Sequence, residues 1–144
     1  MKINVDGEER KFRSVWFEKD EVVLIEQRNL PEKIEFYRAK NSDDIAYAIK
    51  HMVVRGAPAI GVTAAYGLAL AKIKGENMEE AVEKIRKTRP TAYDLFKAID
   101  FMKSNEFRRV TYFSSEFTKF FQGFLLCLFS HPGKTLNPFN KYFP

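Results

Sequence analysis

The residues best suited to chemistry are two arginines, each followed by a proline that fits the start of a helix. Arg55 opens the segment 55–58 (Arg-Gly-Ala-Pro), and Arg89 directly precedes Pro90. Proline is favoured in the first turn of a helix, where its missing N–H costs nothing. A helix N-terminus carries partial positive charge and unpaired N–H donors, which suit a phosphate group. Each guanidinium could add two parallel hydrogen bonds.

Gly56 and Ala57 leave the main chain uncovered beside Arg55. Their N–H groups could therefore approach a ligand closely. We predict that Arg55, Gly56, Ala57 and Arg89 hold one phosphate. The alternative is structural: small residues such as Gly61 let helices pack closely, and both arginines form ordinary surface ion pairs. The residue pattern alone leaves both interpretations open.

Few side chains could do acid–base or nucleophilic chemistry. Cys127 is the only cysteine, so no internal disulfide forms, which fits a reducing compartment. It stands among apolar residues, where an inert buried thiol is expected. His51 lies beside an apolar helical stripe and His131 in irregular chain. No Ser-His-Asp arrangement and no cluster of metal ligands can be assembled, so we predict no catalytic residue and no metal site.

Three short runs in the first forty residues predict β-strands. They cover residues 15–17, 22–25 and 34–37, and they are rich in β-branched and aromatic side chains between charged turns. Asp6-Gly7 is expected to close an earlier hairpin. These strands predict a small antiparallel sheet at about residues 2–40.

From residue 42 the apolar pattern becomes helical. Ser42 is expected to cap a first helix, whose apolar stripe is Ile45, Ile49, Met52 and Val53. Together with the three helices that follow, this predicts a bundle of about four helices over residues 42–104.

The second helix is predicted from Pro58 to about Ile73, with Gly75 in its C-terminal cap. Asn77 is expected to cap the third helix. The fourth should begin near Pro90, where Thr91 and Asp94 have the spacing of a capping box. The predicted fold class is therefore α+β.

The last forty residues differ in composition from the rest. Nine of the fourteen phenylalanines lie in residues 105–144, and residues 120–129 are apolar on every side. We therefore divide the chain into a domain of residues 1–104 and an atypical tail of residues 105–144. The tail is a buried element, a surface covered by a partner, or the product of a shifted reading frame.

The net charge of +5 does not indicate nucleic-acid binding. Residues 1–104 hold 19 basic against 17 acidic side chains, interspersed as on a solvated surface. No apolar run reaches the ~20 residues of a membrane span, and the N-terminus lacks the apolar stretch of a secretory signal. We therefore expect a cytoplasmic protein that binds neither nucleic acid nor membrane.

Three segments carry a family resemblance. Residues 52–67 (Met-Val-Val-Arg-Gly-Ala-Pro-Ala-Ile-Gly-Val-Thr-Ala-Ala-Tyr-Gly) strongly resemble the signature of methylthioribose-1-phosphate isomerases, relatives of the alpha, beta and delta subunits of translation initiation factor 2B. Residues 24–31 and 88–96 resemble two further elements of that family. Glu26 replaces a usual Asp, and Tyr93-Asp94 replaces a usual Val-Asn. The resemblance covers about residues 12–103.

The resemblance implies an aldose–ketose isomerase that converts 5-methylthioribose 1-phosphate to 5-methylthioribulose 1-phosphate in methionine salvage. It implies no cofactor, a homodimer, and phosphate binding by Arg55, Gly56, Ala57 and Arg89. The family's Rossmann-like C-terminal domain, which supplies the catalytic cysteine and aspartate, has no counterpart in this sequence. We therefore expect an N-terminal fragment that is inactive alone.

Three other interpretations stay open. The chain is a fragment of a regulatory subunit like those of initiation factor 2B, a fragment of a ribose-1,5-bisphosphate isomerase, or a nonfunctional remnant. The form of residues 56–61 (Gly-Ala-Pro-Ala-Ile-Gly) favours the methylthioribose-1-phosphate isomerases over both families.

Overall fold

A computed structural model of the chain describes residues 2–5, 8–11 and 13–104. The chain divides into two units, residues 1–104 and 105–144, and the first is described below. The predictions for Cys127, for His131 and for the apolar segment 120–129 concern residues outside the described ones, and they stay predictions.

The predicted antiparallel sheet is confirmed, but its five strands are divided between two separate sheets. β1 and β2 flank Asp6-Gly7, with Val5 opposite Glu8. The second sheet has the order β3-β4-β5. The strands are β1 (Lys2–Val5), β2 (Glu8–Lys11), β3 (Val15–Glu18), β4 (Glu21–Ile25) and β5 (Phe36–Ala39).

A two-residue turn joins β3 to β4. Glu18 lies opposite Glu21, and the two residues between them, Lys19 and Asp20, have φ values of 48° and 62°. Two consecutive positive φ angles define the type I′ turn, whose twist matches that of the flanking strands. The sequence here lacks the Asn-Gly pair that such turns favour.

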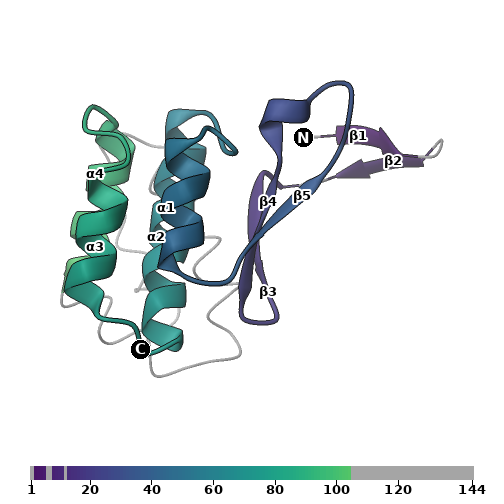
Figure 1. Ribbon diagram of the computed structural model, residues 1–144. Helices are drawn as coiled ribbons and strands as arrows, with labels where there is room; N and C mark the ends of the chain where they lie inside the picture. The colour runs from purple at the N-terminus through teal and green to yellow at the C-terminus, as the bar shows by residue number, and fades with distance from the viewer. Residues whose placement is uncertain (1, 6–7, 12, 105–144) are drawn as a thin grey trace, which may run out of the picture. The chain divides into compact units, whose positions relative to one another are not determined.

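Four helices follow the sheet, as predicted, and consecutive helices run in opposite directions (Figure 1). Short connections at 51–56, 74–77 and 87–92 favour this arrangement. Alternate helices therefore point the same way, and α2 packs along α4. The helices are α1 (Ser42–Lys50), α2 (Ala57–Ile73), α3 (Met78–Arg86) and α4 (Tyr93–Lys103); a 3-10 turn, η1 (Gln27–Asn29), precedes β5.

α2 is the central helix of the unit. It packs on β3 and β4 and on the three other helices. It is apolar on every side and buried from Thr63 to Ala71, as a helix surrounded by other elements should be. Tyr66 stacks on Phe17 of β3, with ring centroids 6.3 Å apart. Gly67 allows α1 and α3 to approach the backbone of α2 closely.

The cap of α1 differs from the prediction. Asn41 is the N-cap, and its side chain accepts a hydrogen bond of 2.8 Å from the N–H of Asp44. Asparagine caps a helix as well as serine does. Ser42 instead lies one residue inside the helix, fully buried, and its N–H and Oγ donate to the carboxylate of Glu76 in the α2–α3 connection. The local pattern predicted that the hydroxyl of Ser42 caps the helix, but this hydroxyl instead binds a residue distant in sequence.

The apolar stripe of α1 also ends earlier than predicted. Ile45, Ile49 and Val53 are fully buried, but Met52 is 44% exposed. The helix ends at Lys50, and Met52 has a φ of 61°. This left-handed residue turns the chain away from the helix axis, so the helical period no longer applies to it.

The start of α4 differs as well. The N–H of Ala92 donates to the carbonyl of Arg89 at 3.1 Å, which closes a turn over residues 89–92. Proline suits the second position of such a turn as well as it suits a helix start. The helix therefore begins after the turn, at Tyr93, and Ala92 makes no side-chain cap bond, so the predicted Thr91–Asp94 capping box is wrong.

Candidate anion-binding site

The connection between α1 and α2 requires glycine at its last residue. Gly56 is the N-cap of α2, with φ 92° and ψ 130°. Side chains rarely adopt this positive φ, although a Cβ added there would meet no atom within 4 Å. The constraint on Gly56 is therefore conformational, and the space around it is open.

The N-terminus of α2 faces solvent. Gly56, Ala57 and Pro58 are exposed, and α2 begins at Ala57, one residue before the predicted start. The first N–H groups of a helix have no acceptor within it, and Pro58 has no N–H. The first intrahelical bond here is from the N–H of Ile60 to the carbonyl of Gly56, at 2.9 Å. Among the described residues, the N–H groups of Gly56 and Ala57 find no acceptor, so they are available to an anion.

Arg55 is exposed and directly precedes this N-cap. Across residues 13–104 its guanidinium forms no ion pair with a carboxylate. Its backbone N–H is engaged, because it donates to Oε1 of Gln27 at 3.1 Å. The side chain rather than the amide of Arg55 is therefore the group that could bind a ligand.

Arg89 lies in the turn before α4, half-buried, and likewise forms no ion pair within the described ranges. Because α2 and α4 run in the same direction, both arginine-bearing connections lie at the same end of the bundle (Figure 1). Arg89 stands four residues before its helix, however, whereas Arg55 stands two residues before α2. The N-terminus of α4 is thus farther along the chain from Arg89 than the N-terminus of α2 is from Arg55.

Two of the three departures from the family pattern, Tyr93 and Asp94, lie in the first turn of α4. Tyr93 is 75% exposed, and Asp94 is half-buried. A carboxylate at a helix N-terminus is favourable for the helix but competes with a bound anion. Asp94 therefore makes the N-terminus of α4 a poorer anion site than that of α2.

Gln27 contacts the candidate site through a hydrogen bond that the sequence did not reveal. Glu26 is buried, and its carboxylate receives Nε and Nη2 of Arg28 at 2.8 and 2.7 Å. The hydrogen bonds from Arg28 lower the pKa of Glu26, against the effect of burial. Between them, Gln27 contacts the backbone of Arg55. The family resemblance of residues 24–31 was the only signal, and it indicated no role.

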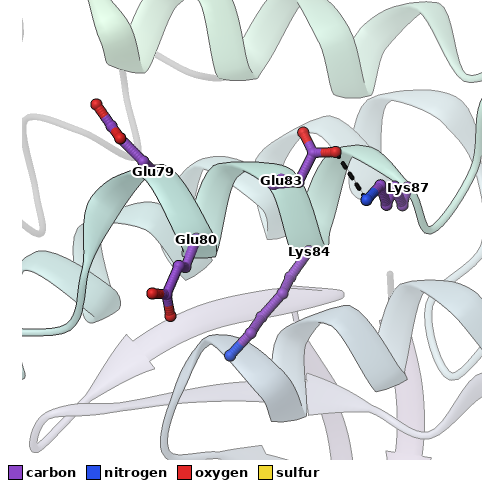
Figure 2. A pocket seen from close by; sticks show the side chains of 5 residues that line it. All are labelled: Glu79, Glu80, Glu83, Lys84 and Lys87. Carbon is purple, nitrogen blue, oxygen red and sulfur yellow. Dashed lines mark ion pairs between the residues drawn. The ribbon is translucent and has the colours of Figure 1, made fainter.

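A charged hollow elsewhere on the unit is explained by paired side chains. A hollow of about 410 Å³ on α3 is lined by Glu79, Glu80, Glu83, Lys84 and Lys87 (Figure 2). Lys87 pairs with Glu83 at 2.8 Å, and Lys84 pairs with Asp43 of α1 at 2.9 Å. Such exposed pairs contribute little to stability and leave no cation unmatched. This surface is a solvated helix face rather than an anion site.

A second hollow, of about 480 Å³, lies beside the Glu26–Arg28 pair and is lined also by Asn29, Glu35, Phe36 and Tyr37. Over the described ranges, no group of three His, Cys, Asp or Glu side chains could hold a metal ion. Over the same residues, no helix is long and apolar enough to cross a membrane.

Comparison with known proteins shows similarity to one family model and to solved structures. Residues 53–120 match the model of the Initiation factor 2 subunit family. The structure is similar to the crystal structure of subunit delta of translation initiation factor eIF-2B from A. fulgidus, with a TM-score of 0.58 and 32% identity over 81% of this chain and 35% of that chain.

The structure of an isomerase is similar to that of this chain to about the same degree, as judged by the TM-score. The crystal structure of 5-methylthioribose 1-phosphate isomerase from Pyrococcus horikoshii OT3 matches with a TM-score of 0.59 and 33% identity, over 80% of this chain and 34% of that chain. A provisionally named methylthioribose-1-phosphate isomerase of Methanocaldococcus jannaschii is 59% identical over 83 residues, which are 58% of this chain and 25% of the relative. This chain is thus similar in sequence and structure to methylthioribose-1-phosphate isomerases, and it spans about a quarter to a third of the length of those that it matches.

Proposed function

We propose that this chain carries the phosphate-binding part of an isomerase that converts 5-methylthioribose 1-phosphate to 5-methylthioribulose 1-phosphate in methionine salvage. Residues 1–104 would form its isomerase-type N-terminal domain, in a cytoplasmic homodimer. The observation that carries this proposal is the solvent-facing N-terminus of α2 beside Arg55, which forms no ion pair with any described residue. The similar proteins bear the name of a sugar-phosphate isomerase.

Each proposed residue has a distinct task. The N–H groups of Gly56 and Ala57 would donate to phosphate oxygens, assisted by the partial positive charge of the helix end. The guanidinium of Arg55 would add hydrogen bonds between opposite charges. Arg89 would approach the same phosphate from the connection before α4, which the parallel course of α2 and α4 supports.

Phosphate binding alone does not accelerate isomerisation. Residues that bind the phosphate about equally in the ground state and the transition state do not lower the barrier between them. Acid–base groups typically contribute ~10²–10⁴-fold in rate. We therefore expect the purified 144-residue chain to bind the sugar phosphate without measurable turnover.

Titration calorimetry of the full chain with 5-methylthioribose 1-phosphate tests the proposal. A hydrogen bond to a charged group is worth about 1.5–3 kcal/mol, so Arg55→Ala and Arg89→Ala should each weaken binding about tenfold to a hundredfold. Arg38→Ala is the matched control, because Arg38 lies on β5 and pairs with Glu18 and Glu21. Wild-type affinity in both Arg55→Ala and Arg89→Ala would refute the proposed site.

A regulatory role is the second candidate, because the two solved relatives have nearly equal TM-scores. The fold thus does not separate an isomerase from an initiation factor subunit. A regulatory module would show affinity for a partner protein and none for the sugar phosphate. Competition between 5-methylthioribose 1-phosphate and ribose 1,5-bisphosphate would show which of the two sugar phosphates the chain binds more tightly, and so which isomerase hypothesis holds. Sedimentation velocity would test the homodimer.

A further inference from the structure

Gln27 connects the turn η1 to the connection that precedes α2. Its backbone N–H donates to the carbonyl of Val53 at 2.9 Å, and its side-chain Oε1 accepts from the N–H of Arg55 at 3.1 Å. One residue thus bonds the backbone of the connection at two points, on either side of Val54. Two bonds two residues apart fix both the position and the direction of a short segment.

Gln27 is itself held firmly on both sides. Glu26 accepts the fork of Arg28 through both carboxylate oxygens and also caps η1 by accepting the N–H of Arg28 at 3.2 Å. The N–H of Glu26 donates to the carbonyl of Glu35 at 2.9 Å. The ion pair within residues 26–28 therefore presents the Gln27 side chain from a rigid support.

We propose that Gln27 is a positioning residue for phosphate binding, which holds the connection so that Arg55, Gly56 and Ala57 face the ligand. This inference rests on the proposed function, because it assigns a role at that same site. Because Gln27 accepts the N–H of Arg55, the N–H groups of the exposed residues Gly56 and Ala57 remain as the donors for the ligand.

The advantage of such a contact is preorganisation. Gly56 has a φ of 92°, and a Cβ added there would meet no described atom within 4 Å, so no described side chain packs against that side of the residue. α2 restrains the segment on one side, and Gln27 restrains it on the other. A connection that is already ordered loses less conformational freedom when a ligand binds, and the affinity is correspondingly higher.

The first measurement follows the contact itself, by amide hydrogen exchange in the full chain without ligand. Gln27→Ala removes the acceptor, so exchange at the Arg55 amide should become about fivefold to tenfold faster, the range expected for one hydrogen bond. Gln27→Glu keeps an acceptor oxygen at the same reach and should restore the protection. Asn29→Ala, on the same turn but bonded outward to Glu35, is the control and should leave the Arg55 amide unchanged.

The second measurement is the affinity for 5-methylthioribose 1-phosphate, with inorganic phosphate as a second probe. Gln27→Ala should weaken binding about fivefold or more, while the thermal midpoint and the exchange of the α2 core amides stay close to wild type. A merely structural role would lower the thermal midpoint and speed exchange throughout the unit instead. That result would overturn the inference, and so would unchanged affinity in Gln27→Ala when the wild-type chain binds.

The two proposals fail in different ways. No binding of either probe by the wild-type chain overturns the proposed function, and the ligand role of Gln27 with it. In that case the exchange at the Arg55 amide still decides whether Gln27 holds the connection. Wild-type binding with an unaffected Gln27→Ala variant overturns the positioning role alone.

Discussion

Replacing Gly67 by alanine adds one methyl group where α2 meets α1 and α3. An added Cβ would lie 2.5 Å from Cγ2 of Ile45 and 3.1 Å from Cδ1 of Ile85. The Cδ1 atom ends a side chain that can rotate. Cγ2 of Ile45 is attached directly to its Cβ, which would itself lie 3.1 Å away, so α1 must shift or Ile45 must leave its preferred rotamer.

Two opposing effects decide the sign of the change. Alanine is favoured over glycine inside a helix by about 1 kcal/mol. Overpacking a close-packed core costs about 1–3 kcal/mol, and a contact of 2.5 Å with a side chain fixed near the backbone belongs at the upper end. We therefore expect Gly67→Ala to lower the free energy of unfolding by about 1–2 kcal/mol, a large part of a stability of about 5–15 kcal/mol.

Urea unfolding of the full chain, followed by circular dichroism, measures this change. The midpoint should fall with little change in the denaturant slope. In a double-mutant cycle, Ile45→Ala should absorb most of the cost of Gly67→Ala, because it removes Cγ2. A Gly67→Ala variant that is more stable than wild type by the ~1 kcal/mol of helix propensity alone would refute the close approach of α1 to α2.

Three further predictions concern the sheet and the helix caps. Replacing Lys19-Asp20 by Asn-Gly should raise the thermal midpoint, because both residues have positive φ; a lowered midpoint would contradict the type I′ turn. The pKa of Glu26 lies below its ordinary value of 4.5 because Arg28 donates to its carboxylate, so its contribution is present above the unfolded-state pKa and is lost as the pH falls through the folded-state pKa. Glu26→Gln should therefore reduce the urea midpoint more at pH 7 than at pH 3, and an equal loss at both would argue against the charged pair. Asn77→Ala removes the acceptor for two first-turn N–H groups of α3 and should cost about 1 kcal/mol in thermal unfolding; no change would mean that the cap is replaced by water.

Sequence patterns predicted those elements whose signals are local. Asn77 caps α3 because the capping bond spans only two or three residues. Leu95, Ile99 and Met102 are buried as their helical spacing indicates. Likewise Gly75, with a φ of 72°, follows the C-cap of α2.

The failures share a cause, which is that one residue type suits two local structures. Pro90 fits a turn as well as a helix start. The structure has a turn there, closed by the hydrogen bond from the N–H of Ala92 to the carbonyl of Arg89. Ser42 fits a cap, but Glu76, 34 residues away, binds its hydroxyl. The contact of Gln27 with Arg55 spans 28 residues and has no period or composition that would reveal it. The arginines of the candidate site were identified by type, whereas their surroundings depended on tertiary structure.

The burial of α2 has a consequence for the order in which parts of the unit open. Its amides from Thr63 to Ala71 are covered by β3, β4 and three helices, so deuterium should reach them only when the whole unit unfolds. The same helix ends, at Gly56 and Ala57, in solvent. Its exposed tip is thus the end of the element whose core should be the slowest in the unit to exchange.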